Sequence, residues 1–389
     1  MISVNTIKFL DKYVGSLLCL FLSINRLFRH KKINKYNRVL IIQLWGIGET
    51  ILTLPAIQAL RKQYKKSNID ILVTERNREV YYKNKFINNV KVLKLNPFSI
   101  KLFILRNLRK YDLVIDMEEY LNISAIIAFY TGKERIGYSH GIRSKLYTET
   151  ITYNDKQHVI YTFLDLLKPL NIKSKIDKLP KLNYSKNDKK NIDNLLKKFN
   201  IGKKDFLVGF GVGAAESAKS RMWPKERFAK LADQLIKKYR AKIILIGNKE
   251  EKKIINQLQE LIINKNNSFN IAGLINTREM FYLISLCKLF IGNDSGPMHV
   301  SAAQHVSTIG LFGCNLPIRF APFGKNNFSV YKKSRLARSV PLTFQNACIN
   351  VHKGQVGECR YGMENACVKK IQVSDVTQIV GKIMERKRK

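Results

Sequence analysis

The stretch from Leu289 to Gly313 restricts the fold of this chain more than any other. A short apolar run, Leu289–Ile291, is typical of a buried strand and leads into a dense cluster of turn-forming residues, 292–297. A helix-compatible segment, Met298–Gln304, and a second apolar run, Val306–Phe312, follow. Strand, tight turn, helix and strand in this order predict one βαβ unit of a parallel sheet.

The turn inside this unit predicts an anion site. Asp294 or Ser295 can cap the new helix, and Pro297 suits its first turn, where a missing N–H costs nothing. The helix would begin with free backbone N–H groups and a partial positive charge beside Gly296, which suits a phosphate. His299 can donate a further hydrogen bond to that anion. The alternative is a capped turn without a ligand, because turns built from Asp, Ser, Gly and Pro are common.

The basic composition narrows the class of partner. Lysine and arginine number 69 against 29 acidic residues, a formal net charge of +40 over 389 residues. Such a charge favours polyanions: an anionic membrane face, a phosphorylated glycolipid, a sugar nucleotide or nucleic acid. The length suggests two domains with extensions, and a hydrophobic content of 45% is that of a globular protein. Six cysteines without a CxxC pair fit a reducing cytoplasm better than a disulfide framework.

Residues 1–35 are expected to form an interfacial helix and a basic segment. The stretch Tyr13–Phe28 is strongly apolar, but its uninterrupted core, Val14–Ile24, is shorter than the ~20 residues of a transmembrane helix. Basic residues follow directly: Arg26, Arg29, His30, Lys31, Lys32 and Lys35. A signal peptide has the opposite order, with its basic residues first. We therefore expect peripheral contact with an anionic membrane, the alternative being a helix packed on the protein's own surface.

Residues 36–175 are expected to form a Rossmann-like domain, because strands and helical segments alternate. The strand Arg38–Leu44 leads through a glycine-bearing turn into the helix Ile51–Tyr64. The turn places Glu49 at the carboxyl end of the first strand, where open α/β sheets keep their sites. Glu49 is either a carboxylate aimed into a cleft or one that favours the positive end of the helix. The G-x-G-x-x-G pattern is incomplete here, so a dinucleotide site is not indicated.

The second half of the chain repeats this pattern. Residues 176–204 are rich in lysine and asparagine and are expected to be the linker. A second Rossmann-like domain is expected over 205–372, with a strand at Phe206–Phe210 and a helix at Lys225–Tyr239. Two α/β halves facing one another would form a cleft between their strand ends. Residues 373–389 are expected to form a C-terminal helix with a basic tail.

The tail brings three cysteines, Cys348, Cys359 and Cys367, near His352. Three thiols and an imidazole could in principle bind zinc, but the spacings are not those of a zinc finger or ribbon. We therefore expect free thiols in a structural loop and no metal site.

Four stretches, in the same order, resemble the heptosyltransferase family, glycosyltransferase family 9. They are Arg38–Pro55, Tyr111–Glu118, the Gly213-to-Pro224 loop with its Trp-Pro, and Asn270–Phe312. The family's cysteine-bearing tail is also similar. The resemblance implies the GT-B fold, with two Rossmann-like domains, a sugar nucleotide on the C-terminal one and the acceptor on the N-terminal one. It implies metal-independent, inverting transfer of heptose or a related sugar. The donor would be a nucleotide-diphosphate sugar such as ADP-heptose, and the acceptor a lipopolysaccharide-type or other lipid-linked glycan.

The resemblance also implies site residues. Those on the donor side are Gly213, Ser217, Arg221, Glu250, Glu251, Asp294, Ser295, Gly296, Pro297 and His299, and those of the acceptor-side loop are Gly46, Gly48 and Thr50. Arg221 stands where the family commonly has lysine, and its guanidinium can still pair with a diphosphate. Either Glu250 or Glu251 would lie near the ribose. No cofactor is implied beyond the donor itself.

By the same resemblance, Glu49 is the catalytic general base. The family usually has aspartate there, and glutamate adds a methylene and about an ångström of reach, which predicts a different acceptor or backbone setting. The enzyme would be cytoplasmic and peripheral at the inner face of the cytoplasmic membrane. The alternatives are a non-catalytic polyanion or nucleic-acid binder and an inactive transferase scaffold. Against the first, the basic residues are dispersed and no nucleic-acid module is recognised.

Overall fold

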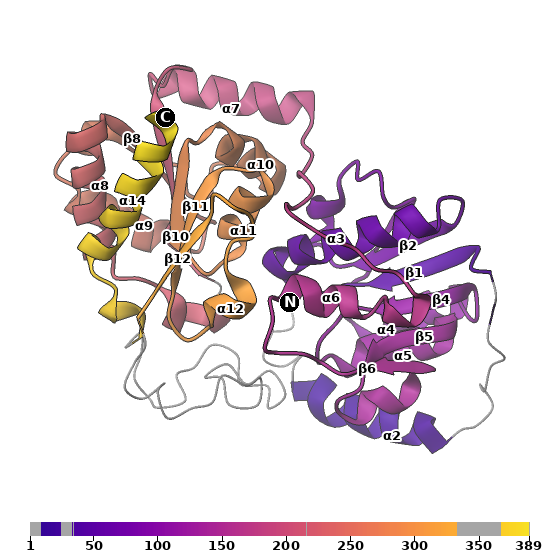
Figure 1. Cartoon of the computed structure of the whole chain (residues 1–389). Coiled ribbons are helices and arrows are strands. Elements are labelled where there is room, and N and C mark those ends of the chain that lie inside the picture. The colour runs from indigo at the N-terminus through magenta and orange to yellow at the C-terminus, as the bar shows by residue number, and fades with distance from the viewer. Residues whose placement is uncertain (1–8, 25–32, 34, 215, 333–366, 389) are drawn as a thin grey trace. The chain divides into compact units, whose positions relative to one another are not determined.

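The computed structural model describes residues 9–24, 33, 35–214, 216–332 and 367–388 (Figure 1). The chain divides into two compact units, and the boundary falls after Ile176. Each unit has its own six-stranded sheet, in which all paired strands are parallel. The predicted α/β class, with two Rossmann-like domains, is therefore confirmed.

The sheet of the first unit has the order β3-β2-β1-β4-β5-β6. Its strands are β1 (Arg38–Ile42), β2 (Asn68–Val73), β3 (Asn89–Val92), β4 (Tyr111–Asp116), β5 (Gly132–Tyr138) and β6 (Glu149–Ile151). Its helices are α3 (Ile47–Gln63), α4 (Pro97–Arg106), α5 (Asn122–Thr131) and α6 (Val159–Asp165). The chain order reverses between β1 and β4, and open α/β sheets bind ligands at the carboxyl ends of the strands at such a point.

Strand β1 is central because it is apolar on both faces: Val39 to Ile42 are all fully buried. The helix after it begins at Ile47, four residues earlier than Ile51, the first residue of the predicted helix. Glu49 therefore lies in the first helical turn rather than in the loop before it.

The N-terminal segment forms a short π-helical turn, Asp11–Gly15, that continues into helix α2, Ser16–Ile24. The Asp11 carboxylate accepts hydrogen bonds from the backbone N–H groups of Asn122 (2.9 Å) and Ile123 (2.8 Å), and so caps α5. Two side chains of α2 are buried: Cys19 and Leu22. Among the described residues, none of the helices has both the length and the apolar character needed to cross a membrane.

The second unit has the sheet order β12-β11-β10-β7-β8-β9, which repeats the topology of the first. Its strands are β7 (Phe206–Gly211), β8 (Ala241–Ile246), β9 (Ser268–Asn270), β10 (Leu289–Asn293), β11 (Ser307–Phe312) and β12 (Phe328–Tyr331). Its helices are α7 (Lys186–Lys198), α8 (Lys225–Tyr239), α9 (Lys252–Leu261), α10 (Thr277–Leu286), α11 (Gly296–Ala303), α12 (Pro317–Phe320) and α14 (Val373–Arg388). Helices α8, α9 and α14 cover one face of the sheet, and α10 and α11 cover the other (Figure 1).

Two segments differ from the expected domain boundaries. Within the expected linker, 176–204, helix α7 packs on α10, where the Asp188 carboxylate pairs with Arg278 at 2.9 Å. Most residues of α7 are lysines and asparagines on its exposed surface, and its short apolar face is recognised only once the helix is packed on α10. The sequence predicts a C-terminal helix and basic tail over 373–389, after the expected end of the second domain. In the structure, this helix is α14, which contributes three side chains to the core of the second unit: Val376, Val380 and Ile383.

Candidate functional site

The turn between β1 and α3 carries the predicted base. Glu49 is half-buried in the first turn of α3, which begins after the N-cap residue Gly46. A Cβ atom at Gly46 would lie 2.6 Å from Glu49 Oε2, so the carboxylate folds back over a backbone that carries no side chain. The Thr50 hydroxyl donates to the Gly46 carbonyl at 2.7 Å and tightens the same turn. Gly48 is half-buried within it.

Glu49 lines a small pocket at the carboxyl ends of β1 and β4. The other residues of this pocket are Gln43, Trp45, Met117, Glu118, Glu119, Tyr120 and Phe163. This is the edge of the sheet at which the sequence predicts a site, and the pocket contains acidic as well as aromatic side chains. A carboxylate in such a place can accept a proton from a hydroxyl that enters the pocket.

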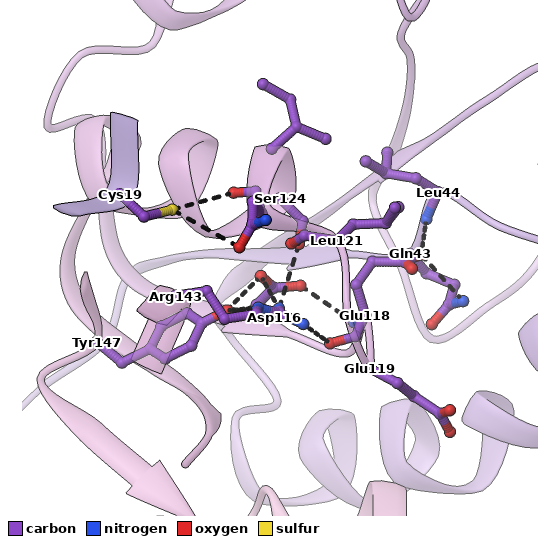
Figure 2. Close-up of polar contacts among 12 residues, drawn as sticks. Cys19, Gln43, Leu44, Asp116, Glu118, Glu119, Leu121, Ser124, Arg143 and Tyr147 are labelled. Carbon is purple, nitrogen blue, oxygen red and sulfur yellow. Dashed lines mark hydrogen bonds and ion pairs between the residues drawn. The ribbon is translucent and has the colours of Figure 1, made fainter. Parts of the chain in front are cut away.

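Glu118 is a pocket residue to which sequence reasoning gave no role. Its Oε1 atom accepts hydrogen bonds from the backbone N–H groups of Leu44 (2.5 Å) and Trp45 (3.0 Å), and from Gln43 Nε2 (3.3 Å). Figure 2 shows the contacts with Gln43 and Leu44. Burial, and next the charge of Asp116, raise the pKa of Glu118 to about 8. In the sequence, Glu118 lies two positions beyond a buried strand and ends the family-like stretch Tyr111–Glu118.

A buried ion pair supports Glu118. Arg143 Nη2 lies 2.8 Å from Asp116 Oδ2, and the Tyr147 hydroxyl donates to the same oxygen at 2.7 Å (Figure 2). Arg143 Nη1 also donates to the backbone carbonyl of Glu118 at 2.7 Å. A buried ion pair needs further hydrogen bonds to offset its desolvation, and the contacts with Tyr147 and the Glu118 carbonyl supply them here.

In the second unit, the predicted anion site lies at the start of α11. Ser295 occupies the N-cap position and Pro297 the first turn, as predicted. The prediction that a side chain caps this helix is wrong, because Ser295 Oγ donates to the Asn293 carbonyl at 3.2 Å instead. Asp294 does not cap it either. Gly296 begins the helix, so the approach to its first turn is free of a side-chain cap.

The Asp294 carboxylate instead gathers polar side chains beside this helix start. Arg221 Nη1 lies 3.3 Å from Asp294 Oδ2, and Asn315 Nδ2 donates to the same oxygen at 2.5 Å. His299 Nε2 lies 3.9 Å from the other oxygen, Oδ1. The carboxylate therefore holds one permanent cation and one imidazole next to the positive end of a helix, an arrangement that suits a phosphate.

Asn293 is a second residue that the sequence did not single out. Its Nδ2 donates to the Val212 carbonyl at 2.6 Å, and its Oδ1 accepts the backbone N–H of Trp223 at 3.0 Å. One buried amide thus joins the loop after β7, the Trp-Pro segment and the end of β10. In the sequence, the only indication of a role for Asn293 was its position among the turn-forming residues.

Of the two acidic candidates for the ribose, Glu251 and not Glu250 faces the loop after β7. A Cβ atom at Gly213 would lie 1.9 Å from Glu251 Oε1, so this glycine allows the close approach. Glu251 Oε2 accepts the backbone N–H of Asn248 at 2.8 Å, and burial raises its pKa. Glu250 is exposed. Ser217 lies in a 3₁₀ helix, Glu216–Arg221, and its side chain is outside the described ones.

The structure thus brings most predicted donor-side residues to the carboxyl ends of β7, β8 and β10. Cys348, Cys359 and His352 lie outside the described residues, and Cys367 is half-buried directly before the 3₁₀ helix Val368–Lys370. Within the described part of the chain, no group of three or more His, Cys, Asp or Glu side chains is arranged to hold a metal ion.

Comparison with known proteins relates both units to one family. The model of glycosyltransferase family 9 (heptosyltransferase) matches residues 104–341. The chain is 26% identical over 303 residues to lipooligosaccharide heptosyltransferase 2 of Haemophilus ducreyi, covering 74% of this chain and 86% of that protein.

Solved structures have the same fold. A family 9 glycosyl transferase from Veillonella parvula matches with a TM-score of 0.75 and 20% identity, over 92% of this chain and 100% of the other. The E. coli ADP-heptose lps heptosyltransferase II matches with a TM-score of 0.69 and 16% identity, over 90% and 100%. The fold is therefore GT-B, as the sequence predicts.

Proposed function

This chain belongs to glycosyltransferase family 9, and from that premise we propose that it transfers heptose or a related sugar from ADP-heptose to a lipopolysaccharide-type acceptor. Family membership decides in favour of an enzyme over the alternative of a non-catalytic polyanion binder. Donor and acceptor classes are proposed from what the names of the relatives state: a lipooligosaccharide heptosyltransferase and an ADP-heptose enzyme.

We propose Glu49 as the general base of an inverting reaction. Its carboxylate removes the proton of an acceptor hydroxyl, the oxygen attacks the anomeric carbon of the donor, and the nucleoside diphosphate leaves. The observation that carries this assignment is the setting of Glu49, a half-buried carboxylate beside a small pocket at the carboxyl end of β1. Gly46, Gly48 and Thr50 shape the turn that holds it.

On the second unit, the leaving diphosphate would be stabilised by protein groups. Arg221 and His299 lie beside the start of α11, and together with its first-turn backbone N–H groups they would bind the negative charge that increases on the diphosphate as the glycosidic bond breaks. Arg221 would supply the positive charge, and His299 and the backbone N–H groups the hydrogen bonds, that stabilise the leaving diphosphate. Glu251, beside Gly213, would accept hydrogen bonds from the ribose hydroxyls.

We further propose that α2 holds the enzyme at the inner face of the cytoplasmic membrane, near a lipid-linked acceptor. One side of α2 is buried, while three large apolar side chains at helical spacing on the other side, Leu17, Phe21 and Ile24, are 68%, 70% and 73% exposed. A large apolar face is costly in water. The basic residues that follow it in sequence, up to Lys35, complement anionic headgroups.

The catalytic proposal is tested with Glu49→Gln and with Glu49→Asp as the matched control. Glutamine has the size of glutamate but cannot act as a base, so transfer should fall by at least ~10²-fold. ADP-heptose should still raise the melting temperature of the variant, because the proposed donor contacts lie on the second unit. Full activity of Glu49→Gln would contradict the assignment of Glu49 as the base.

The donor is identified by a thermal-shift panel of ADP-, GDP- and UDP-linked sugars. Stabilisation by a UDP- or GDP-sugar only would contradict ADP-heptose as the donor.

A further inference from the structure

The turn that carries Glu49 is held by a carboxylate from another strand. Glu118 lies just past the end of β4, is 2% exposed, and gathers at one oxygen atom the backbone N–H groups of Leu44 and Trp45. These are the two residues that precede the N-cap Gly46 of α3. Their direction sets where the helix begins, and therefore where its first turn points the Glu49 side chain.

The backbone N–H and carbonyl groups of Glu118 both make hydrogen bonds. Its N–H donates to Asp116 Oδ1 at 3.0 Å, and its carbonyl accepts from Arg143 Nη1 at 2.7 Å (Figure 2). Arg143 in turn pairs with Asp116 and lies 3.3 Å from Ser124 Oγ on α5. Glu118 therefore connects strand β4, the segment of Arg143 and, through Arg143, helix α5. Its side chain reaches the turn that carries Glu49.

We propose that Glu118, clamped by the Asp116–Arg143 pair, is a positioning residue that fixes the β1–α3 turn and thereby the aim of the Glu49 carboxylate. This inference rests on the proposed role of Glu49. The mechanism does not need Glu118 to touch a substrate. A displacement of about 1 Å at a reacting group can cost about 10²-fold in rate, so a turn held by three hydrogen bonds to one oxygen matters for kcat.

The pKa of Glu118 also responds to the charge of Glu49. The charged groups around Glu118 are Asp116 on its own strand end, Glu49 on α3 and Arg143 near β6. The first two raise the pKa of Glu118 and the third lowers it, although burial is the largest cause. When Glu118 ionises near pH 8, a negative charge appears in the pocket of the base. The kcat profile should therefore contain an inflection near pH 8 that depends on Glu118.

The test compares Glu118→Ala with Glu118→Gln in the full-length protein. The alanine variant loses the acceptor of the turn, and we expect kcat to fall by about 10- to 100-fold with the donor KM unchanged. The glutamine variant keeps an acceptor oxygen, so its kcat at pH 7 should stay within a few-fold of the wild type, while the inflection near pH 8 disappears. Glu134→Ala is the matched control, since Glu134 is a buried carboxylate of β5 that holds Tyr36 and not the turn.

The outcomes separate this inference from the function on which it rests. Loss of activity in Glu49→Gln, together with an unchanged kcat in Glu118→Ala and an unchanged pH profile in Glu118→Gln, would overturn the positioning role alone. Full activity in Glu49→Gln would overturn the base assignment itself. If Glu118→Ala does not fold, Glu118→Met replaces it, because methionine has a similar length but no acceptor oxygen. An unchanged kcat in that variant contradicts the proposal, and a fall of about 10- to 100-fold with the donor KM unchanged supports it.

Discussion

The guanidinium of Arg221 is anchored by the carboxylate of Asp294, with Nη1 3.3 Å from Oδ2 and 3.5 Å from the Asp294 backbone carbonyl. The two residues lie 73 positions apart, and the pair joins the Trp-Pro segment to the start of α11. Arginine presents five N–H donors, so it can hold Asp294 and also donate to a ligand. A lysine ammonium has three donors from a single nitrogen, and this offers a reason for arginine at this position.

Replacing Arg221 should weaken donor binding. A charge-assisted hydrogen bond contributes about 1.5–3 kcal/mol, so Arg221→Ala should raise the Kd for ADP by about 10- to 100-fold, and Arg221→Lys by less. Isothermal titration calorimetry with ADP measures both. Lys225→Ala is the control for net charge, because Lys225 contacts Gln257 instead. Equal ADP affinity in Arg221→Ala and the wild type would exclude this residue from the donor site.

Gly213 should not tolerate a side chain. Alanine there would place Cβ 1.9 Å from Glu251 Oε1, so the carboxylate must move, and overpacking of this kind costs about 1–3 kcal/mol. We expect a lower unfolding free energy in urea and weaker ADP binding. At Gly202 an added Cβ would meet Asp205 Oδ2 at an ordinary 3.7 Å, so Gly202→Ala serves as the control. Identical behaviour of the two variants would show that the Gly213–Glu251 contact is unimportant.

The pKa of Glu118 predicts a pH-dependent stability. Burial raises this pKa from the usual 4.5 to about 8, so the folded state binds one more proton than the unfolded state between these values. The contribution of Glu118 to the unfolding free energy is therefore fully present below pH 4.5. It is lost as pH rises towards 8, by at most about 1.4 kcal/mol per pH unit.

The measurement is urea denaturation of the wild type and Glu118→Gln at pH 5, 6, 7 and 8. Glutamine does not titrate, so the difference between the two proteins should change with pH and favour the variant increasingly at pH 8. A difference that stays constant from pH 5 to pH 8 would mean that the pKa of Glu118 is close to its usual value in the folded protein.

The exposed face of α2 should determine membrane binding. Burying a large apolar side chain contributes about 1.5–3 kcal/mol, so the triple variant Leu17→Ser, Phe21→Ser, Ile24→Ser should bind vesicles at least ~10-fold more weakly. Flotation with phosphatidylglycerol-containing vesicles measures this, and neutral phosphatidylcholine vesicles test the role of charge. Ile263→Ser, at a residue 84% exposed in the second unit, is the control. Unchanged flotation of the triple variant would refute docking through α2.

Sequence patterns predicted the elements with strong local signals. The predicted unit at 289–313 appears as β10, α11 and β11 with shifts of one or two residues at most of its element boundaries, because apolar runs and turn-forming residues act locally. Helix α7 was missed because its buried apolar side chains are few, namely Ile192 and Leu196 among lysines and asparagines. Helix α4 was missed too, and none of its residues is fully buried.

Sequence alone predicted the two-unit α/β fold, the family and many residues of the candidate site, but not Glu118 or Asn293. Periodicity, turn chemistry and motifs can all be read along the chain. The sequence could not show which residues far apart in the chain become hydrogen-bond or ion-pair partners. Only the tertiary structure decided that Asp294 holds Arg221 rather than capping α11, and that Glu118 supports the turn of Glu49. Hydrogen bonds and ion pairs depend on distances of about 3 Å. Folding sets such distances between residues that are tens of positions apart in the chain.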